Sequence, residues 1–142
     1  MKEVVEEVER LCDSCKMSFV PNELEYLRAG GRVSNAVFIG GKILSIHPSI
    51  EIENGYLVAK KKYRGKMENI VPRLIEDYSI KKNLDKKEVW LLWSIGLSDK
   101  VRRVAEDKVK ELGFEQFRWM QTGCVITTHG GPGSFGIVGF SK

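Results

Sequence analysis

The sequence predicts an α/β fold in which helices pack against a mixed sheet. Segments with the three-to-four residue periodicity of amphipathic helices alternate with short apolar runs typical of strands, and an Asn-Gly pair marks a tight hairpin. Such alternation is typical of one sheet covered by helices. A length of 142 residues with 42% apolar residues suits a single domain with one core.

The chain is predicted to open with an amphipathic helix, because apolar residues recur at steps of three and four between Val4 and Cys15. We expect this helix to need a partner surface. Residues 16–20 then predict a short strand. Asn22 and Glu25 form a capping-box pattern ahead of a short helix, which the following Gly-Gly pair ends.

An ambiguous apolar segment comes next, followed by a predicted ribbon. The glycine-interrupted segment 34–46 fits either a helix or a strand, and we favour a helix. Residues 47–52 and 56–63 predict two paired strands, because Asn54-Gly55 between them supplies the positive φ angles of a tight hairpin turn.

The second half predicts helices alternating with strands. Helical periodicity covers residues 67–78, where Pro72 must sit in the first turn or kink the helix, and Ser98 caps a further helix that Gly113 ends. The apolar run 89–95 predicts a strand in the middle of a sheet covered on both faces. Further strands are predicted at 114–121, 124–128 and 135–140.

Composition and charge indicate a soluble cytoplasmic protein. No apolar run is long enough to span a membrane, and the N-terminal segment lacks the pattern of a signal peptide. With 23 basic and 19 acidic residues, the net charge of +4 is too small and too interspersed to indicate nucleic-acid binding. Three cysteines, an odd number, argue against a disulfide framework.

The segment from Thr127 to Gly136 is the most informative candidate site. Its four glycines and one proline predict a loop after a strand, with a backbone that could approach a ligand closely and present N–H groups to an anion. His129 could donate a hydrogen bond to the same anion. A plain turn, with the histidine bonded to a neighbouring carbonyl, explains the composition equally well. Neither a P-loop nor a dinucleotide fingerprint is present.

Two basic features are further candidates. Arg32 follows two glycines at a helix end, where its guanidinium could pair with a carboxylate or phosphate, or simply lie on the surface. The basic cluster, which we define as residues 60–66, fits a solvated strand edge, since lysines discourage edge pairing, or a docking surface for an acidic partner.

The sequence offers little for metal binding or catalysis. Cys12 and Cys15 have the spacing of a redox pair, but they lie near the end of the opening helix, so we interpret them as core or boundary residues. No second pair completes a zinc site. A nucleophile elbow and a paired-carboxylate pattern are also missing, which disfavours a stand-alone enzyme.

Three segments in order and spacing, LEYLRAGGRVS, ILSIHPSIEIENGYLVAKKKYRGK and THGGPGSFGIVGF, resemble the C-terminal part of the DegV family of fatty-acid-binding proteins. The resemblance covers nearly the whole chain. One departure is His47-Pro48, where family members often carry lysine before the proline. The resemblance implies that residues 1–142 are the acyl-tail-binding C-terminal domain of a protein about twice this length. The N-terminal domain would be absent, and we expect the chain to be a fragment.

The resemblance also implies roles for individual residues. His129, with Gly130 and Gly131, would lie close to the fatty-acid carboxylate, and Arg32 would border the head-group region. Arg64, together with Lys62, would lie near the surface that meets a fatty acid kinase. Residues of the ambiguous segment would line the tail or form ordinary core: Phe38, Ile39, Ile43 and Leu44.

The function implied is that of a carrier without catalytic groups, cofactor or metal. It would present a long-chain fatty acid to a kinase that makes acyl phosphate with ATP, and could contact membranes peripherally for lipid exchange. Burial of about fourteen methylenes at about 0.8 kcal/mol each could supply roughly 11 kcal/mol before ordering costs. One alternative is a transferase domain that binds a phosphorylated metabolite with the glycine-rich loop and Arg32. Another is a pure interaction module that uses the basic cluster.

Overall fold

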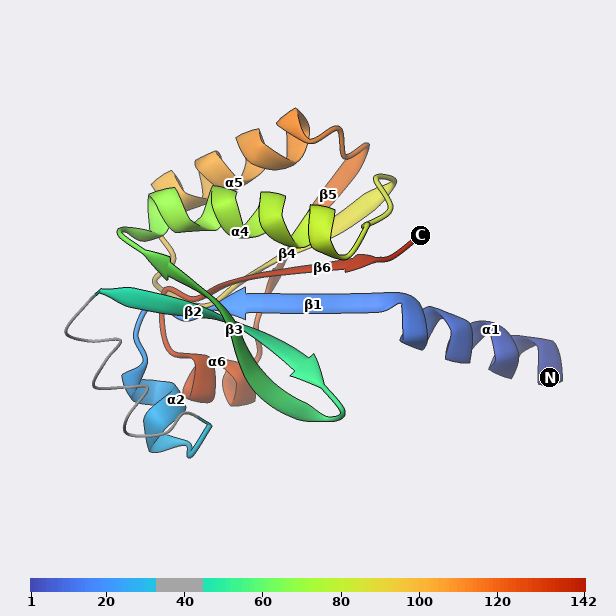
Figure 1. Ribbon diagram of the computed structural model, residues 1–142, viewed down its shortest axis with the longest axis horizontal. Coiled ribbons are helices and arrows are strands. Elements are labelled where there is room, and N and C mark those ends of the chain that lie inside the picture. The colour runs from blue at the N-terminus through green and yellow to red at the C-terminus, as the bar shows by residue number, and fades with distance from the viewer. Residues whose placement is uncertain (33–44) are drawn as a thin grey trace.

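The computed structural model describes residues 1–32 and 45–142. The elements in chain order are α1 (Lys2–Ser14), β1 (Cys15–Val20), α2 (Glu25–Ala29), β2 (Ile46–Glu53), β3 (Tyr56–Arg64), α4 (Met67–Lys81), β4 (Glu88–Trp93), α5 (Asp99–Glu111), β5 (Gln116–Gln121), α6 (Cys124–Gly130) and β6 (Phe135–Phe140). Figure 1 shows α4 and α5 above the strands, α2 and α6 below them, and α1 projecting beyond the start of β1.

The described strands form one six-stranded sheet in the order β3-β2-β1-β6-β4-β5. Only β4 and β5 pair in parallel, and α5 connects them as the crossover helix of a βαβ unit. The other neighbours pair antiparallel. A mixed sheet with helices packed against it confirms the predicted α/β fold class.

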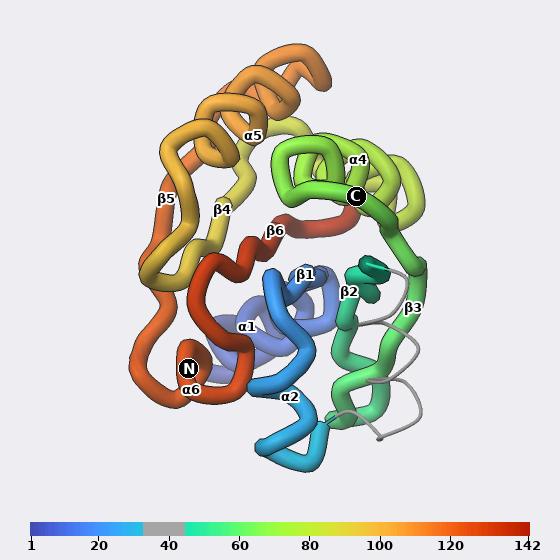
Figure 2. Tube along the Cα trace, turned by 90° about the vertical axis from the view of Figure 1, so that its left-hand side faces the viewer, coloured from blue at the N-terminus to red at the C-terminus, as the bar shows by residue number. Residues whose placement is uncertain are grey.

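The two faces of the sheet are covered unequally. On the covered face, Val20, Leu91 and Ile137 are fully buried in one large cluster with the apolar sides of α4 and α5. Neighbouring residues in a strand point to opposite faces. Phe19 and Leu92 therefore lie on the other side, which we call the open face. Figure 2 shows α4 and α5 on one side of the strands and the short helices α2 and α6 on the other.

The β2–β3 hairpin forms as predicted. Asn54 and Gly55 adopt positive φ angles of 50° and 80°, as the tight hairpin turn requires. Tyr63 attaches the hairpin to α4, because its buried ring places the hydroxyl where it donates a 2.9 Å hydrogen bond to Oδ2 of Asp77. Burial, and secondly this hydrogen bond, raise the pKa of Tyr63 well above its usual value.

A buried carboxylate makes a second link between the hairpin and α4. Glu51 in β2 has 4% of its side chain exposed, and its two oxygens lie 2.9 Å from Nζ of Lys81 and 3.1 Å from Nζ of Lys82. Burial alone would raise the pKa of Glu51, but the contacts with the two lysines outweigh it, so the pKa is lowered. The carboxylate is thus kept charged inside the fold.

α1 forms as predicted, but its apolar side is not covered by the described residues. It has no buried residue, and the exposed fractions of Val4 and Val8, on its apolar side, are 65% and 52%. The partner surface that its amphipathic pattern calls for is therefore not supplied by the part of the chain that the structure describes.

The prediction of a strand at residues 124–128 is wrong, because this segment is helix α6. The β-branched residues Val125, Ile126 and Thr127 favour strands locally, but tertiary context overrides this preference. Two threonine hydroxyls support the helix. Thr128 donates to the carbonyl of Cys124 at 2.8 Å, and the hydroxyls of Thr122 and Thr127 lie 2.9 Å apart.

Two finer predictions also differ from the structure. The capping box of Asn22 and Glu25 does not form, since Leu24 occupies the N-cap of α2 without a side-chain hydrogen bond, and Asn22 instead packs against Gly133. Pro72 lies inside α4, beyond its first turn. The helix nevertheless continues to Lys81. Burial of its apolar side in the large cluster explains why it tolerates an internal proline.

Candidate functional site

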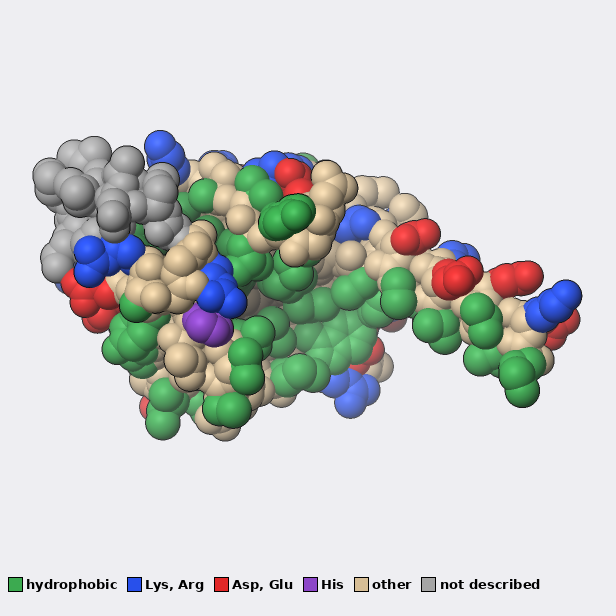
Figure 3. All heavy atoms as spheres, turned by 90° about the horizontal axis from the view of Figure 1, so that it is seen from below, with side chains coloured by type: hydrophobic (Ala, Val, Ile, Leu, Met, Phe, Trp, Pro, Cys, Tyr) green, Lys and Arg blue, Asp and Glu red, His purple; other side chains and the backbone are tan. Residues whose placement is uncertain are grey.

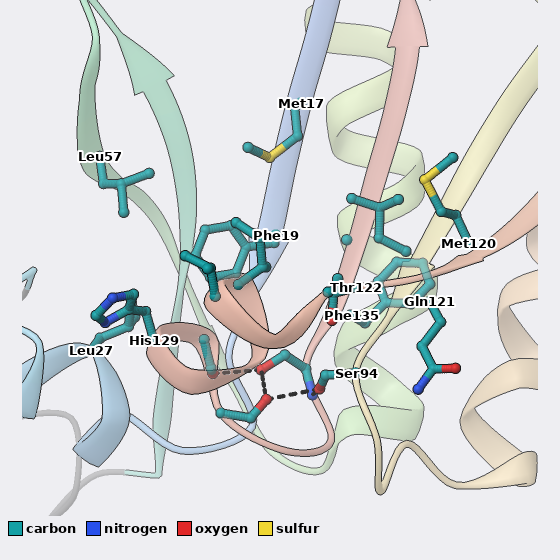
Figure 4. Close-up of a pocket in the computed structure, with 18 of the residues that line it drawn as sticks. Met17, Phe19, Leu27, Leu57, Ser94, Met120, Gln121, Thr122, His129 and Phe135 are labelled. Atoms are coloured by element: carbon teal, nitrogen blue, oxygen red, sulfur yellow. Dashed lines mark hydrogen bonds between the residues drawn. The ribbon is translucent and has the colours of Figure 1, made fainter.

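A pocket of about 460 Å³ opens on the open face of the sheet. Its volume lies within the range of small-molecule sites, about 300–1,000 Å³. Strands β1, β4 and β6 form its floor, and α6 forms one wall (Figure 4). Most of its lining is apolar: Met17, Phe19, Leu27, Ile52, Leu57, Leu92, Met120, Val125, Ile126 and Phe135. Figure 3 shows that hydrophobic side chains continue across this face and onto α1.

Strand β4 explains why the sequence did not reveal this pocket. It lies inside the sheet as predicted, between β5 and β6, but only Val89 and Leu91 on its covered face are fully buried. Leu92 on the open face is half-buried and lines the pocket. The expectation that both faces would be covered is therefore wrong for the described residues. The continuous apolar run of β4 fits a strand buried on both faces as well as a strand with one face lining a pocket, so the sequence carried no signal that separates the two.

His129 marks the polar end of the pocket. It lies in the last turn of α6, and its ring packs against the end of α2, where Gly30 leaves room for it. A Cβ atom on Gly30 would lie only 2.6 Å from Nδ1 of His129. Arg32 also lines the pocket, and its Nη1 donates to the carbonyl of Gly30. Two cationic or hydrogen-bonding groups thus converge on one end of an apolar cavity.

Two serines that the sequence analysis missed hold the glycine-rich loop in place. Ser94, at the end of β4, donates to the carbonyl of Gly131 at 2.7 Å and accepts from the backbone N–H of Ser134 at 2.8 Å. The hydroxyl of Ser134 donates to the carbonyls of Gly130 at 2.7 Å and of Gly131 at 3.0 Å. Both serines are buried. No sequence signal links Ser94 to a loop some forty residues away.

The loop differs from the expectation in two respects. It follows a helix, and its N–H groups are engaged within the protein: that of Gly131 donates to Thr127, that of Gly133 to Ile95, and that of Ser134 to Ser94. Gly131 has a φ of 83° and packs under the ring of Tyr26, so a side chain there would be both strained and obstructed. Side chains at the polar end, and not this backbone, are therefore the available donors for an anion.

The structure brings Arg32, His129, Gly130 and Gly131 to the same pocket. Their role in ligand binding stays a prediction. Most of segment 34–46, which was predicted to be helical, lies outside the described residues. So do the four further residues predicted to line the ligand: Phe38, Ile39, Ile43 and Leu44.

The basic cluster lies on β3, at the edge of the sheet. Lys60 pairs with Glu53, and Lys61 pairs with Asp77, in both cases at 2.6 Å. Lys62 and Arg64 are exposed and form no ion pair with another described residue. They present positive charge on the last strand of the described sheet, which fits both interpretations of the cluster.

The remaining candidates lie apart from the pocket. Nδ1 of His47 is 3.1 Å from the carbonyl oxygen of Pro21, and the ring lines a separate pocket of about 300 Å³. Cys12 and Cys15 are exposed free thiols at the junction of α1 and β1, so they are boundary and not core residues. Within residues 1–32 and 45–142, no group of three or more metal-ligating side chains comes together.

Comparison with known families places these features in context. The family model described as "Uncharacterised protein, DegV family COG1307" matches residues 1–142. A DegV domain-containing protein of Clostridium acetobutylicum is 31% identical over 147 residues, which cover 98% of this chain and 49% of the relative. A "Fatty acid-binding protein" of Thermotoga maritima is 29% identical over 131 residues, covering 86% of this chain and 42% of the relative.

Solved structures share the fold. A fatty acid binding DegV family protein from Streptococcus agalactiae superposes with a TM-score of 0.81 at 24% identity, over 100% of this chain and 50% of that one. The Fatty Acid Kinase (Fak) B3 protein of Streptococcus pneumoniae, loaded with linoleic acid, gives a TM-score of 0.85 at 17% identity, over 99% and 50% of the two chains. The chain thus spans about half the length of these relatives.

No helix among its described residues combines the length and apolar content needed to cross a bilayer.

Proposed function

The chain belongs to the DegV family, and on that premise we propose that it binds a long-chain fatty acid whose acyl tail lies in the open-face pocket. The pocket's combination of a mostly apolar surface with two basic side chains, Arg32 and His129, carries this proposal. An acyl chain matches such a surface, because each buried methylene contributes about 0.8 kcal/mol. The names of the T. maritima and S. agalactiae relatives, and the linoleic acid in the S. pneumoniae protein, support the same ligand class.

We place the fatty-acid carboxylate at the polar end, beside His129 and Arg32. Both side chains line the pocket there, and Gly30 lies between them: its Cα carries no side chain against the His129 ring, and its carbonyl accepts from Arg32. A carboxylate accepting hydrogen bonds from both groups would be oriented with its tail towards the apolar lining. Tail burial would dominate the affinity, while the head-group contacts would set the direction of binding.

The open face requires a cover, and we propose that a separate N-terminal domain supplies it. Apolar side chains line the open face, and the apolar side of α1 packs against no described residue. Exposed apolar surfaces of this extent are typical of interfaces and ligand grooves. The relatives are about twice as long as this chain, which leaves room in them for such a domain.

We further propose a carrier role without catalysis, in which the bound acid is presented to a fatty acid kinase. The S. pneumoniae protein named for that kinase shares the fold, and Lys62 and Arg64 offer a positively charged strand edge to an acidic partner. The transferase alternative gains less support, because an anion held by the glycine-rich loop would need N–H groups that Gly131, Gly133 and Ser134 use internally.

Native mass spectrometry with organic extraction tests the lipid-binding proposal. We define the two-domain form as this chain preceded by an upstream half, taken from its own gene or, where the gene supplies none, from the C. acetobutylicum relative. Purified from bacteria, the two-domain form should carry fatty acid, and joint replacement of His129 and Arg32 by alanine should remove most of it. A folded two-domain form that carries no fatty acid and takes up no added oleate would contradict the proposal.

The kinase proposal has its own test. Charge reversal in Lys62→Glu/Arg64→Glu should weaken binding to a fatty acid kinase at least tenfold and leave oleate affinity unchanged. Arg103→Glu, an exposed change on α5 and hence on the covered side of the sheet, is a control for a single charge reversal and should alter neither. Equal kinase affinity for wild type and double variant would exclude this strand edge as the docking surface.

A further inference from the structure

Strand β6 presents side chains of increasing size along the open face. Its residues there are Gly136, Val138 and Phe140, in order of distance from the glycine-rich loop. Gly136 has no side chain, Val138 has a branched one, and Phe140 carries a ring. The floor of the pocket therefore rises along β6, away from the polar end marked by His129.

Gly136 creates a gap in a row of large side chains. Its partners across the sheet are Phe19 on β1 and Leu92 on β4. A Cβ atom on Gly136 would lie 3.2 Å from Cβ of Phe19 and 3.3 Å from Cβ of Leu92. Without it, the floor of the pocket is lowest at Gly136, over the backbone of β6.

Val138 raises the floor again. It pairs with Met17 on β1 and with Trp90 on β4. The ring of Trp90, beside Val138, meets that of Phe140, the next open-face residue of β6, edge to face, with their centroids 5.8 Å apart. The pocket lining includes Gly136 but none of Val138, Trp90 and Phe140. The isopropyl group of Val138 is thus the first obstacle beyond the open floor.

We propose that Val138 limits the length of the acyl chain that the pocket accepts, an inference that rests on the proposed fatty-acid binding. A strand rises about 3.3 Å per residue, so Val138 lies about 7 Å beyond Gly136 along β6. An extended chain advances about 1.2 Å per bond, since three backbone bonds span about 3.3–3.6 Å. The step from Gly136 to Val138 therefore corresponds to about six carbons of an extended acyl chain. The position of the obstacle on β6 thus sets how long an acid the pocket accepts.

Variants at Val138 test this inference in both directions. Val138→Ala should lengthen the preferred saturated acid by about two carbons, because two methyl groups are removed. Val138→Phe should shorten it by a similar amount. Val138→Thr keeps the shape and is the matched control, expected to leave the preference unchanged. Val138 is half-buried, so these changes spare the core formed by α4 and α5.

The readout is the Kd of the two-domain form for saturated acids of 12 to roughly 20 carbons, measured by competition with one fluorescent fatty acid. Each added methylene that finds space should tighten binding about fourfold, and the series should level off at the limiting length. The inference predicts that this limit moves with the size of residue 138. An unchanged limit in folded Val138→Ala and Val138→Phe variants would overturn it while leaving fatty-acid binding intact. Failure of the wild type to bind any acid would instead overturn the proposed function.

Discussion

Replacing Gly30 by alanine should weaken fatty-acid binding by displacing a neighbouring side chain. The new Cβ would lie 2.6 Å from Nδ1 of His129, whereas ordinary contacts begin at about 3.4 Å, so the ring must move by about 0.8 Å. A hydrogen bond to a charged group contributes about 1.5–3 kcal/mol, and its loss corresponds to roughly a 10- to 150-fold rise in Kd. The φ of Gly30 is −78°, which alanine adopts readily, so the free energy of unfolding should not fall.

The assay is calorimetric titration of the two-domain form with oleate, combined with thermal unfolding. His129→Ala alone should produce a similar loss of affinity. In the His129→Ala background, Gly30→Ala should have no further effect, because the side chain it displaces is gone. Unchanged affinity in Gly30→Ala would refute the role assigned to the His129 ring. Additive losses in the double variant would show that Gly30 acts by another route.

Three further predictions concern stability, each measured by urea unfolding. Glu51→Gln should lower the free energy of unfolding by about 1–2 kcal/mol at pH 7. This deficit should shrink as the pH falls below 4.5 and through the lowered pKa of Glu51, because the wild-type carboxyl is then protonated too; a constant deficit would contradict the ion pairs. Tyr63→Phe should cost about 1 kcal/mol through the lost bond to Asp77. Since the pKa of Tyr63 is raised in the fold, the wild type should lose stability relative to Tyr63→Phe above pH 10, where the unfolded phenol ionises; parallel pH curves would argue against it. Ser98→Ala should cost about 1 kcal/mol by removing the bond that Val101 donates to the cap of α5, whereas Ser98→Asp should preserve it.

Elements specified by local chemistry were predictable from the sequence. The Asn54-Gly55 turn imposes positive φ angles that few other pairs accept, so the hairpin followed directly. The periodicity of α4 and α5 matches the side that each buries, and the Ser98 cap fixes the start of α5. The helical periodicity of α1 was equally clear, although nothing described covers its apolar side.

Features that depend on distant contacts were not predictable. α6 consists largely of β-branched residues, which favour strands locally, so its helical state depends on its tertiary context. The Ser94–Ser134 hydrogen bond joins residues forty positions apart. The open face of β4 was interpreted as core, because periodicity cannot distinguish a side chain buried under a helix from one that lines a ligand pocket.

The candidate site was predicted in part. Arg32 and His129 were identified from their segments and lie at one pocket, but the contact of Gly30 with the His129 ring became visible only in three dimensions. The backbone N–H groups expected to bind an anion are used within the loop, because Ser94 and the carbonyls of Thr127 and Ile95 compete for them.

Photo-crosslinking with fatty acids that carry a diazirine at opposite ends tests the central claim most directly. In the two-domain form, a probe next to the carboxylate should label α6 and the end of α2, near His129. A probe at the terminal carbon should label β1 and β6, near Met17 and Val138, and excess oleate should suppress both. Labelling of this chain confined to the β3 edge or to the pocket around His47, or labelling that oleate does not suppress, would contradict the account.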